Sequence, residues 1–343
     1  MLDNAVFVLS RSKAVEQYNV VRGLCDCVSY SFKTNPSVGA VVEECTDSMF
    51  CVHSFDALKL IKDKKRVWYF AQAWDDDELE RVLKLNVGSF VVDNVKDLSV
   101  LVDYIGRKGV KVNLMLRMRL KENTVHTGKY FVFGMYSREI NRLIPELRKN
   151  ERIGLLGVHF HRKTQNVSEW SLVDEIGEAL DSETIEMIDI LDIGGGLPVR
   201  YRNYSDLNIE GIFGKVREFR GWLNERGVKL VMEPGRFISG PAVRLDARIK
   251  RIYDNNIIVN CSVYNSAMDT IAANIKLLVE GEIDKGCAYT VKGCTPCSTD
   301  IFRYRVFLDN PKEGDRIVFL NAGAYTFSTD FCNLKKLATR VVD

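Results

Sequence analysis

The sequence has no long apolar run, and none of its apolar stretches approaches the ~18 residues that a membrane-spanning helix requires. Its first segment, MLDNAVFVLSRSK, combines an acidic residue at position 3 with only a short apolar run. Neither a signal peptide nor a transit peptide has this pattern. We therefore expect a protein without membrane spans and without an export signal.

The chain also lacks an excess of charge of either sign. The 48 Lys and Arg residues nearly balance the 46 Asp and Glu residues, the net charge is +2, and both signs are interspersed along the chain. A surface for nucleic acid or for a lipid bilayer would need a basic patch or run. We expect no nucleic-acid or membrane partner, and a small molecule as the ligand.

Paired cysteine motifs are almost absent. Nine cysteines, an odd number, are scattered over a large chain without an export signal, which indicates reduced thiols in the cytoplasm. Cys294 and Cys297, in GCTPCSTD, form a C-x-x-C, but structural zinc needs four ligands and the histidines supply no second pair. A thioredoxin-type pair needs a helix after it, whereas DIFRYRVFLD is typical of a strand. We expect neither a metal site nor a redox pair there.

Strands and helices alternate up to about residue 240. Segments with apolar residues at helical spacing, such as 76–85, 95–105 and 136–149, separate short β-rich runs. Eight such repeats with nearly continuous apolar strands predict an α/β fold, a closed (β/α)₈ TIM barrel over residues 10–240. The expected strands are 28–33, 49–54, 66–71, 89–94, 111–118, 155–161, 189–196 and 229–235.

The pattern changes after GPAV at 240–243. Strand-like runs joined by turns follow, with little helical periodicity, at 244–254, 255–264, 286–294, 300–307 and 315–325. We expect a C-terminal β-rich domain made of residues 241–343 together with residues 1–9.

Chemically useful side chains gather where the barrel strands are expected to end, on the face that carries the active sites of such barrels. They are Lys33, His53, Asp93, Arg117, His161, the glycines 194–196 and Glu233.

Two adjacent strand ends carry glycines and indicate a phosphate site. In LDIGGGLP at 191–198 and EPGR at 233–236, backbone N–H groups could approach an anion closely. Lys33 ends an otherwise apolar strand, where desolvation favours the neutral amine that a Schiff base requires. Lysine-linked pyridoxal 5′-phosphate accounts for both features, and Glu233 would then pair with its ring nitrogen.

The HFH stretch supplies two histidines on the same side of one strand. His161, nearer the strand end, could stack on the cofactor ring. His159 lies deeper and is expected to be a hydrogen-bonded core histidine.

In this order the motifs resemble the ornithine/diaminopimelate decarboxylase family of fold-type III pyridoxal phosphate enzymes. That family combines a barrel with a β domain, as in alanine racemase. The resemblance spans nearly the whole chain through SYSFKTN, GVHFHRKT, DIGGGLP, EPGR and NAGAYTF (321–327).

The resemblance implies a role for each matched residue. Lys33 would form the Schiff base with the cofactor, His161 would stack on the ring, and Glu233 would meet the ring nitrogen. The other implied cofactor-binding residues are Arg117, Thr164, Gly194, Gly195, Gly196, Gly235, Arg236 and Tyr325.

The loop GCTPCSTD resembles a family loop of the form G-P-x-C, by which one subunit completes the active site of the other. This implies a homodimer with two shared sites, and a loop cysteine that gives a proton to the substrate carbon after carbon dioxide leaves. An ungapped overlay places Pro296 at the family's cysteine and Cys297 one position later. Cys297 as proton donor therefore assumes a local shift of the loop.

The substrate pocket departs from the ornithine pattern. The two acidic positions that hold a distal ammonium in ornithine decarboxylases are Cys261 and Cys297 here, and the nearest carboxylates are Asp269 and Asp300. Diaminopimelate enzymes hold a distal carboxylate with an arginine, for which this chain offers only Lys276. We favour an amine-bearing substrate. Its candidate ligands are Cys261, Asp269, Cys297 and Asp300.

The sequence thus predicts a cytoplasmic, homodimeric decarboxylase of a basic L-amino acid or polyamine precursor, of the ornithine/lysine or carboxynorspermidine type. The alternatives are a diaminopimelate decarboxylase, an amino-acid racemase on the same fold and a non-catalytic regulatory homologue. A racemase would usually have arginine where this chain has Glu233, and a non-catalytic homologue would be expected to have lost cofactor residues such as Lys33.

Overall fold

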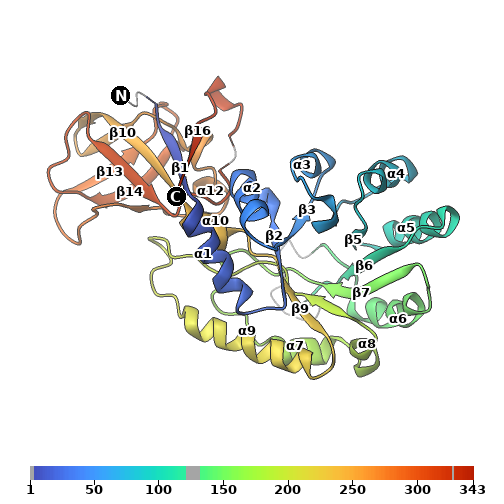
Figure 1. Cartoon of the computed structure of the whole chain (residues 1–343). Helices are drawn as coiled ribbons and strands as arrows, with labels where there is room; N and C mark the ends of the chain where they lie inside the picture. Colours follow the sequence, from blue (N-terminus) through green and yellow to red (C-terminus); the bar gives the residue numbers. More distant parts are fainter. Residues whose placement is uncertain (1–3, 121–131, 327) are drawn as a thin grey trace.

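Eight parallel strands close into a barrel, and a second, mixed sheet stands beside it (Figure 1). The structure is a computed structural model that describes residues 4–120, 132–326 and 328–343. Each barrel strand overlaps one of the eight predicted runs, which confirms the TIM barrel. The strands are β2 (Cys27–Ser31), β3 (Met49–Val52), β4 (Val67–Tyr69), β5 (Ser89–Val92), β6 (Val112–Arg117), β7 (Ile153–His159), β8 (Ile190–Asp192) and β9 (Lys229–Met232).

Helices connect the barrel strands and form its outer layer (Figure 1). The three helices predicted from periodicity are confirmed as α4, α5 and α6. The helices of this part are α1 (Arg11–Arg22), α2 (Pro36–Cys45), α3 (Phe55–Lys59), α4 (Asp76–Lys84), α5 (Val95–Lys108), α6 (Ser137–Arg148), α7 (Leu172–Ala179), α8 (Ser182–Glu186), α9 (Ile209–Asn224) and α10 (Arg236–Ala242), with short 3₁₀ turns η1 (Phe32–Thr34) and η2 (Lys64–Arg66). Among the described residues, no helix is both long and apolar enough to cross a membrane.

Local side-chain chemistry sets where these helices begin and end. Asn94 starts α5, since its side chain accepts a hydrogen bond from the Asp97 backbone N–H at 2.9 Å. Gly109 ends α5 with φ of 70°, a left-handed conformation that glycine adopts without a steric penalty. Asp75 caps α4 in the same way as Asn94 caps α5.

Buried side chains fill the inside of the barrel. Residues from six of the barrel strands, with Phe70, form a small apolar cluster separate from the main core between strands and helices: Cys51, Trp68, Phe70, Val91, Met115, Ile190 and Val231. A filled interior is the normal state of an eight-stranded barrel, so a ligand must bind at one of its ends.

The second sheet contains both ends of the chain. β1 (Val6–Ser10) pairs antiparallel with β10 (Val243–Tyr253) and parallel with β16 (Ala338–Val342). The division into residues 10–240 and 1–9 plus 241–343 stays a prediction, which this pairing supports. The other strands are β11 (Asn256–Val259), β12 (Leu278–Val279), β13 (Ala288–Lys292), β14 (Ile301–Phe307) and β15 (Arg316–Leu320); the sheet order is β12-β15-β10-β11-β13-β14.

Two strand-like runs of this part were predicted too long, and the run 315–325 forms strand only as Arg316–Leu320. The run 255–264 forms strand only as far as Val259, and α11 (Val263–Ser266) begins soon after it. Ser262 accepts from the Tyr264 N–H, and Asn265 Oδ1 accepts from the Ser262 N–H at 3.0 Å. This reciprocal cap turns the chain out of the sheet. Two further short segments are α12 (Asp269–Ala272) and η3 (Phe331–Asn333).

Candidate active site

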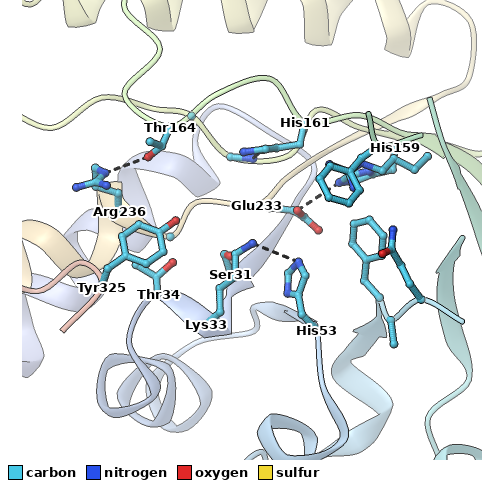
Figure 2. Close-up of a pocket in the computed structure, with 18 residues that line it drawn as sticks. Ser31, Lys33, Thr34, His53, His159, His161, Thr164, Glu233, Arg236 and Tyr325 are labelled. Atoms are coloured by element: carbon cyan, nitrogen blue, oxygen red, sulfur yellow. Dashed lines mark hydrogen bonds and ion pairs between the residues drawn. The ribbon is translucent and has the colours of Figure 1, made fainter. Parts of the chain in front are cut away.

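A cavity of about 370 Å³ opens at the C-terminal ends of the barrel strands (Figure 2). It is lined by residues at the ends of seven of these strands, all except β5, and by Tyr325 from the segment after β15. The lining residues are Ser31, Lys33, Thr34, His53, Phe70, Ala71, Gln72, Arg117, Phe133, His159, His161, Thr164, Gly195, Gly196, Glu233, Gly235, Arg236 and Tyr325.

Lys33 extends into this cavity from η1, not from the strand itself. Strand β2 ends at Ser31, two residues earlier than predicted, because Asn35 already caps α2 through Ser37 N–H at 3.0 Å and the chain must turn. The Lys33 side chain is exposed toward the open cavity, and its Nζ lies 3.5 Å from His53 Nε2.

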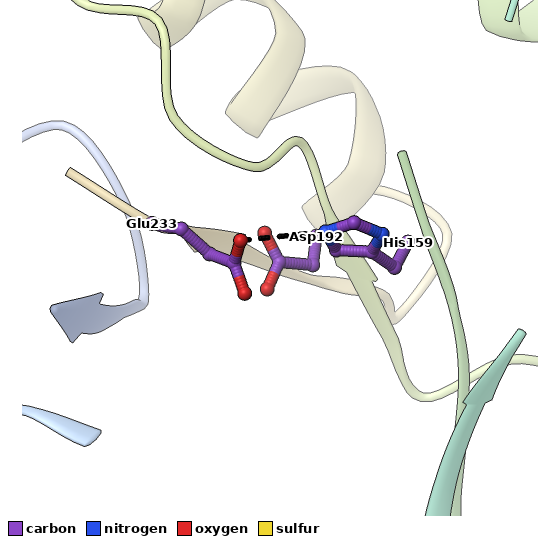
Figure 3. A group of neighbouring side chains, drawn as sticks. All are labelled: His159, Asp192 and Glu233. Carbon is purple, nitrogen blue, oxygen red and sulfur yellow. Dashed lines mark hydrogen bonds and ion pairs between the residues drawn. The ribbon is translucent and has the colours of Figure 1, made fainter. Parts of the chain in front are cut away.

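Glu233 lies at the floor of the cavity beside a second carboxyl group and a histidine (Figure 3). Its Oε2 is 3.4 Å from His159 Nε2, and ligand atoms of His159, Asp192 and Glu233 all lie within 4.8 Å of one another. His159 is fully buried and hydrogen-bonded, as the sequence predicted. Glu233 Oε1 and Asp192 Oδ2 are buried without a hydrogen-bond partner among the described residues.

The pKa values of these two carboxyl groups shift in opposite directions. Burial and the nearby Glu233 raise the pKa of Asp192 well above its ordinary value. Burial would also raise the pKa of Glu233, but the neighbouring His159, with Cys51 and His53, lowers it to about 2. Glu233 is therefore a buried anion with an unpaired oxygen, which suits a protonated ring nitrogen.

The opposite side of the cavity is built for an anion. Arg236 is buried, and its Nε donates to Thr164 Oγ1 at 3.1 Å while its Nη1 donates to Tyr201 and Asp269. Its Nη2 has no hydrogen-bond partner among the described residues, and neither has the buried Thr34 Oγ1. The Tyr325 ring lies 5.2 Å from the guanidinium.

Glycines at this side leave room that other residues would fill. Gly196 has φ of 118°, which side-chain-bearing residues rarely adopt. A Cβ on Gly235 would lie 2.1 Å from Thr34 Oγ1, and one on Gly195 would lie 2.7 Å from the Glu233 carbonyl oxygen. Pyridoxal phosphate fits these groups. Its phosphate matches the unpaired Arg236 and Thr34 groups and the glycine backbone, its ring nitrogen matches the Glu233 anion, and its aldehyde matches the Lys33 amine.

Two further predicted residues, His161 and Arg117, line the cavity. His161 lies between these two sides, and its Nδ1 accepts from the Gly195 N–H at 3.2 Å. Arg117 ends β6, donates to Asp93 at 2.8 Å and packs over the Phe70 and Phe133 rings.

Tyr325 reaches the cavity from the segment after β15. Its backbone N–H donates to the Thr34 carbonyl at 2.9 Å, and Asn35 Nδ2 donates to the Gly323 carbonyl at 2.9 Å. These bonds tie the β-rich part of the chain to the turn that carries Lys33. Phe327, the last residue of the predicted tyrosine motif, lies outside the described residues.

The loop GCTPCSTD lies between β13 and β14 and is held from within by Asp300. Its carboxylate accepts from the Val263 N–H at 2.9 Å, the Thr295 N–H at 3.0 Å and the Thr295 hydroxyl at 2.7 Å. Asp300 is 1% exposed, so its oxygens are occupied in holding this loop against α11. The structure gives its suggested role as a substrate ligand no support.

The other suggested substrate ligands do not line this cavity. Burial raises the pKa of the Cys261 thiol, which makes it unsuited to pair with an ammonium. Asp269 is paired with Arg236, so it orients the anion site instead. Cys297 is half-buried on the loop surface, and all nine cysteines are free thiols.

Sequence reasoning missed part of the site. It named His53 and Asp93 as strand-end residues without a role, and it did not single out Thr34, Asp192 or Tyr201. Asp192 stands in LDIGGG, where it was read only as part of a glycine motif. For Tyr201 the sequence carries no local signal, because its contact is with Arg236 at the start of α10, 35 positions further along the chain.

Comparisons with known proteins find a matching family model and similar sequences. The model of the pyridoxal-dependent decarboxylases, pyridoxal binding domain, matches residues 56–240. Diaminopimelate decarboxylase of Bacillus subtilis (strain 168) is 24% identical over 95% of this chain and 81% of its own length. That of Pseudomonas aeruginosa is 24% identical over 98% of this chain and 87% of its own length.

Solved structures share the fold. Lysine/ornithine decarboxylase from Vibrio vulnificus, complexed with putrescine, is similar with a TM-score of 0.82 and 21% identity, covering 99% of this chain and 94% of that one. Diaminopimelate decarboxylase from Helicobacter pylori, complexed with L-lysine, gives a TM-score of 0.82 and 18% identity, covering 99% and 92%.

Proposed function

Because the chain belongs to the pyridoxal-dependent decarboxylase family and is a pyridoxal phosphate-dependent amino-acid decarboxylase, we propose that it removes the α-carboxyl group of a basic L-amino acid or polyamine precursor. One observation carries the assignment of the site. Lys33 follows β2, Glu233 and Arg236 both follow β9, and all three line a single cavity. This set supplies an amine, a buried anion and a buried cation for one cofactor.

The proposed roles follow from the chemistry of each group. Lys33 would hold the cofactor covalently and give way to the substrate amine. Glu233 would keep the ring nitrogen protonated, because its own pKa is about 2 and it stays charged. Arg236, Gly195 and Gly196 would bind the phosphate, with Thr164, Gly194, Gly235 and Tyr325 shaping that side.

The rest of the chemistry concerns orientation and protons. When bound, pyridoxal phosphate supplies the electron sink for the pair left behind as carbon dioxide departs. His161 would lie against the ring, and Arg117 would bound the substrate side of the cavity. Cys297 of the partner subunit would give the proton to the substrate carbon, which requires a homodimer with shared sites. The cytoplasmic location stays a prediction.

The distal group of the substrate is proposed to be an amine. Diaminopimelate is the second candidate, favoured by relatives such as those of B. subtilis and P. aeruginosa. A distal carboxylate would need a cation. Lys276 lines a different surface pocket with Arg202 and Arg303, and Arg117, which lines the cavity, is already paired with Asp93 at 2.8 Å. The basic amino acid therefore remains the preferred substrate class.

Two measurements test this proposal. The wild-type protein with added pyridoxal phosphate should show the absorbance band of lysine-bound cofactor, and Lys33→Ala should abolish it. Carbon dioxide release should then be measured on ornithine, lysine, arginine, diaminopimelate and carboxynorspermidine. Absence of the band would overturn the cofactor site, and release from diaminopimelate alone would overturn the substrate preference.

A further inference from the structure

His53 lies beside Lys33, and the proposed function assigns it no role. It follows β3, and its Nε2 is 3.5 Å from Lys33 Nζ (Figure 2). This is the contact that the Lys33 amine makes at the cavity wall. Cys51, two residues earlier on the strand, has its Sγ 3.9 Å from the same His53 nitrogen.

The His53 ring is fixed by its packing. It lies against Phe70 from the end of β4, with ring centroids 5.3 Å apart and planes tilted by 32°. Its other nitrogen, Nδ1, is buried without a hydrogen-bond partner among the described residues. Since Phe70 fixes the plane and Nδ1 faces protein, Nε2 is the nitrogen that serves the cavity.

The charged and titratable groups around His53 favour an uncharged imidazole. Besides Lys33 and Cys51, these groups are Glu233 after β9, His159 on β7 and Arg117 on β6. Burial, followed by the charge of Lys33, lowers the pKa of His53 to about 4. A neutral ring can hydrogen-bond the lysine nitrogen without adding a second positive charge next to it.

We propose that His53 is a positioning residue for Lys33, holding the lysine amine through Nε2 where it can form, and later regain, its bond to the cofactor. This inference rests on the proposed function, because it needs Lys33 to be the cofactor's anchor. A flexible lysine without this contact would have many more rotamers to search before each attachment.

The experiment follows attachment of pyridoxal phosphate to the cofactor-free protein by the rise of the lysine-bound absorbance band. His53→Phe keeps the ring and its packing on Phe70 but removes both nitrogens. His53→Gln keeps a polar group able to hydrogen-bond Lys33. We expect the rate of attachment to fall about tenfold in H53F, because one hydrogen bond to Lys33 is lost. In H53Q the rate should be largely restored.

A double variant separates this role from general damage to the site. Equilibrium binding of pyridoxal phosphate, followed by tryptophan fluorescence, should be weaker in H53F than in wild type, but equal in K33A and K33A/H53F. An H53F rate equal to wild type, or an equal defect in H53F and H53Q, would overturn the proposal. So would an H53F defect that persists undiminished in the K33A background.

The outcomes also distinguish this inference from the function on which it rests. If wild-type protein never develops the lysine-bound band, the proposed function itself is wrong. If the band forms and H53F matches wild type, only the role of His53 is wrong.

Discussion

At the scale of single residues, the most consequential arrangement is the pair of carboxyl groups under the cavity. Glu233 and Asp192 are both buried, yet their pKa values shift in opposite directions. Two like charges this close repel strongly in a low dielectric, which favours the protonated form of Asp192. His159 stands beside Glu233 and stabilises the charge there. The negative charge of the pair is thereby favoured at Glu233, the residue proposed to meet the ring nitrogen.

Asp192→Asn tests this division of charge in the cofactor-free protein. The pKa of Asp192 is raised in the folded state, so its contribution to stability is complete below its ordinary value of about 3.9 and is lost as the pH rises. Asparagine stays uncharged and can still accept from the Gly194 N–H, as Asp192 Oδ1 does at 2.7 Å. We expect the free energy of unfolding of D192N, measured in urea, to gain on that of wild type between pH 4 and pH 8.

Asp93→Asn is the matched control, because Asp93 is a buried carboxylate paired with Arg117 at 2.8 Å. Its loss leaves a cation without its partner, so D93N should lose stability at neutral pH. A D192N protein that loses stability relative to wild type as the pH rises would contradict the assigned protonation of Asp192.

Glu233→Gln tests the charge that remains. Glutamine fills the same space but cannot keep a ring nitrogen protonated, so the electron sink should weaken. We expect kcat to fall about 10- to 100-fold, the value of one hydrogen bond to a charged group. The lysine-bound absorbance band should persist, because Lys33 is intact. A kcat equal to wild type would exclude the proposed role of Glu233.

At the scale of elements, the turns after β2 and β9 pack together tightly. Gly235 stands at the start of α10, where a Cβ would lie 2.1 Å from Thr34 Oγ1 in the turn that carries Lys33. Gly235→Ala should push these turns apart. We expect a dissociation constant for pyridoxal phosphate at least about tenfold higher, measured by fluorescence titration, since 1.4 kcal/mol suffices for that change.

Gly214→Ala serves as the control for this substitution. Gly214 lies within α9, and a Cβ there meets no atom within 4 Å. The G214A variant should bind cofactor like wild type and gain roughly 0.5–1 kcal/mol in unfolding free energy from higher helix propensity. Equal cofactor affinity in G235A and G214A would show that the close approach of the two turns does not matter.

The elements also show how far sequence reasoning reaches. The eight strands and the residues at their ends were predictable because apolar runs and glycine motifs are local signals. That the strand-end residues share one cavity was predictable because the active sites of such barrels lie at the C-terminal ends of the strands. The Arg236–Asp269 pair was not predictable, since it joins residues 33 positions apart through tertiary packing. Asp300 was taken for a substrate ligand, because nothing local reveals that its oxygens hold the loop to α11.

At the scale of the whole molecule, the chain after β15 reaches the site directly, and a loop of the second sheet is proposed to reach the site of a second subunit. Within one chain, Tyr325 reaches the barrel mouth and its backbone bonds to Thr34. Cys297, by contrast, lies on the loop between β13 and β14, and this loop does not line the cavity of its own chain. A proton donor must come within hydrogen-bond reach of its acceptor. Cys297 can therefore act only if a second subunit presents it.

Mixing two inactive variants tests this arrangement directly. Lys33→Ala removes the cofactor anchor from one subunit, and Cys297→Ala removes the proposed donor from the other. Each homodimer should be inactive, whereas half of the randomly assorted dimers would contain one complete site. Activity in an equal mixture should therefore reach about a quarter of wild type. A C297A protein that is fully active alone would exclude Cys297 as the donor, and a mixture that stays inactive would exclude sharing of the site between subunits.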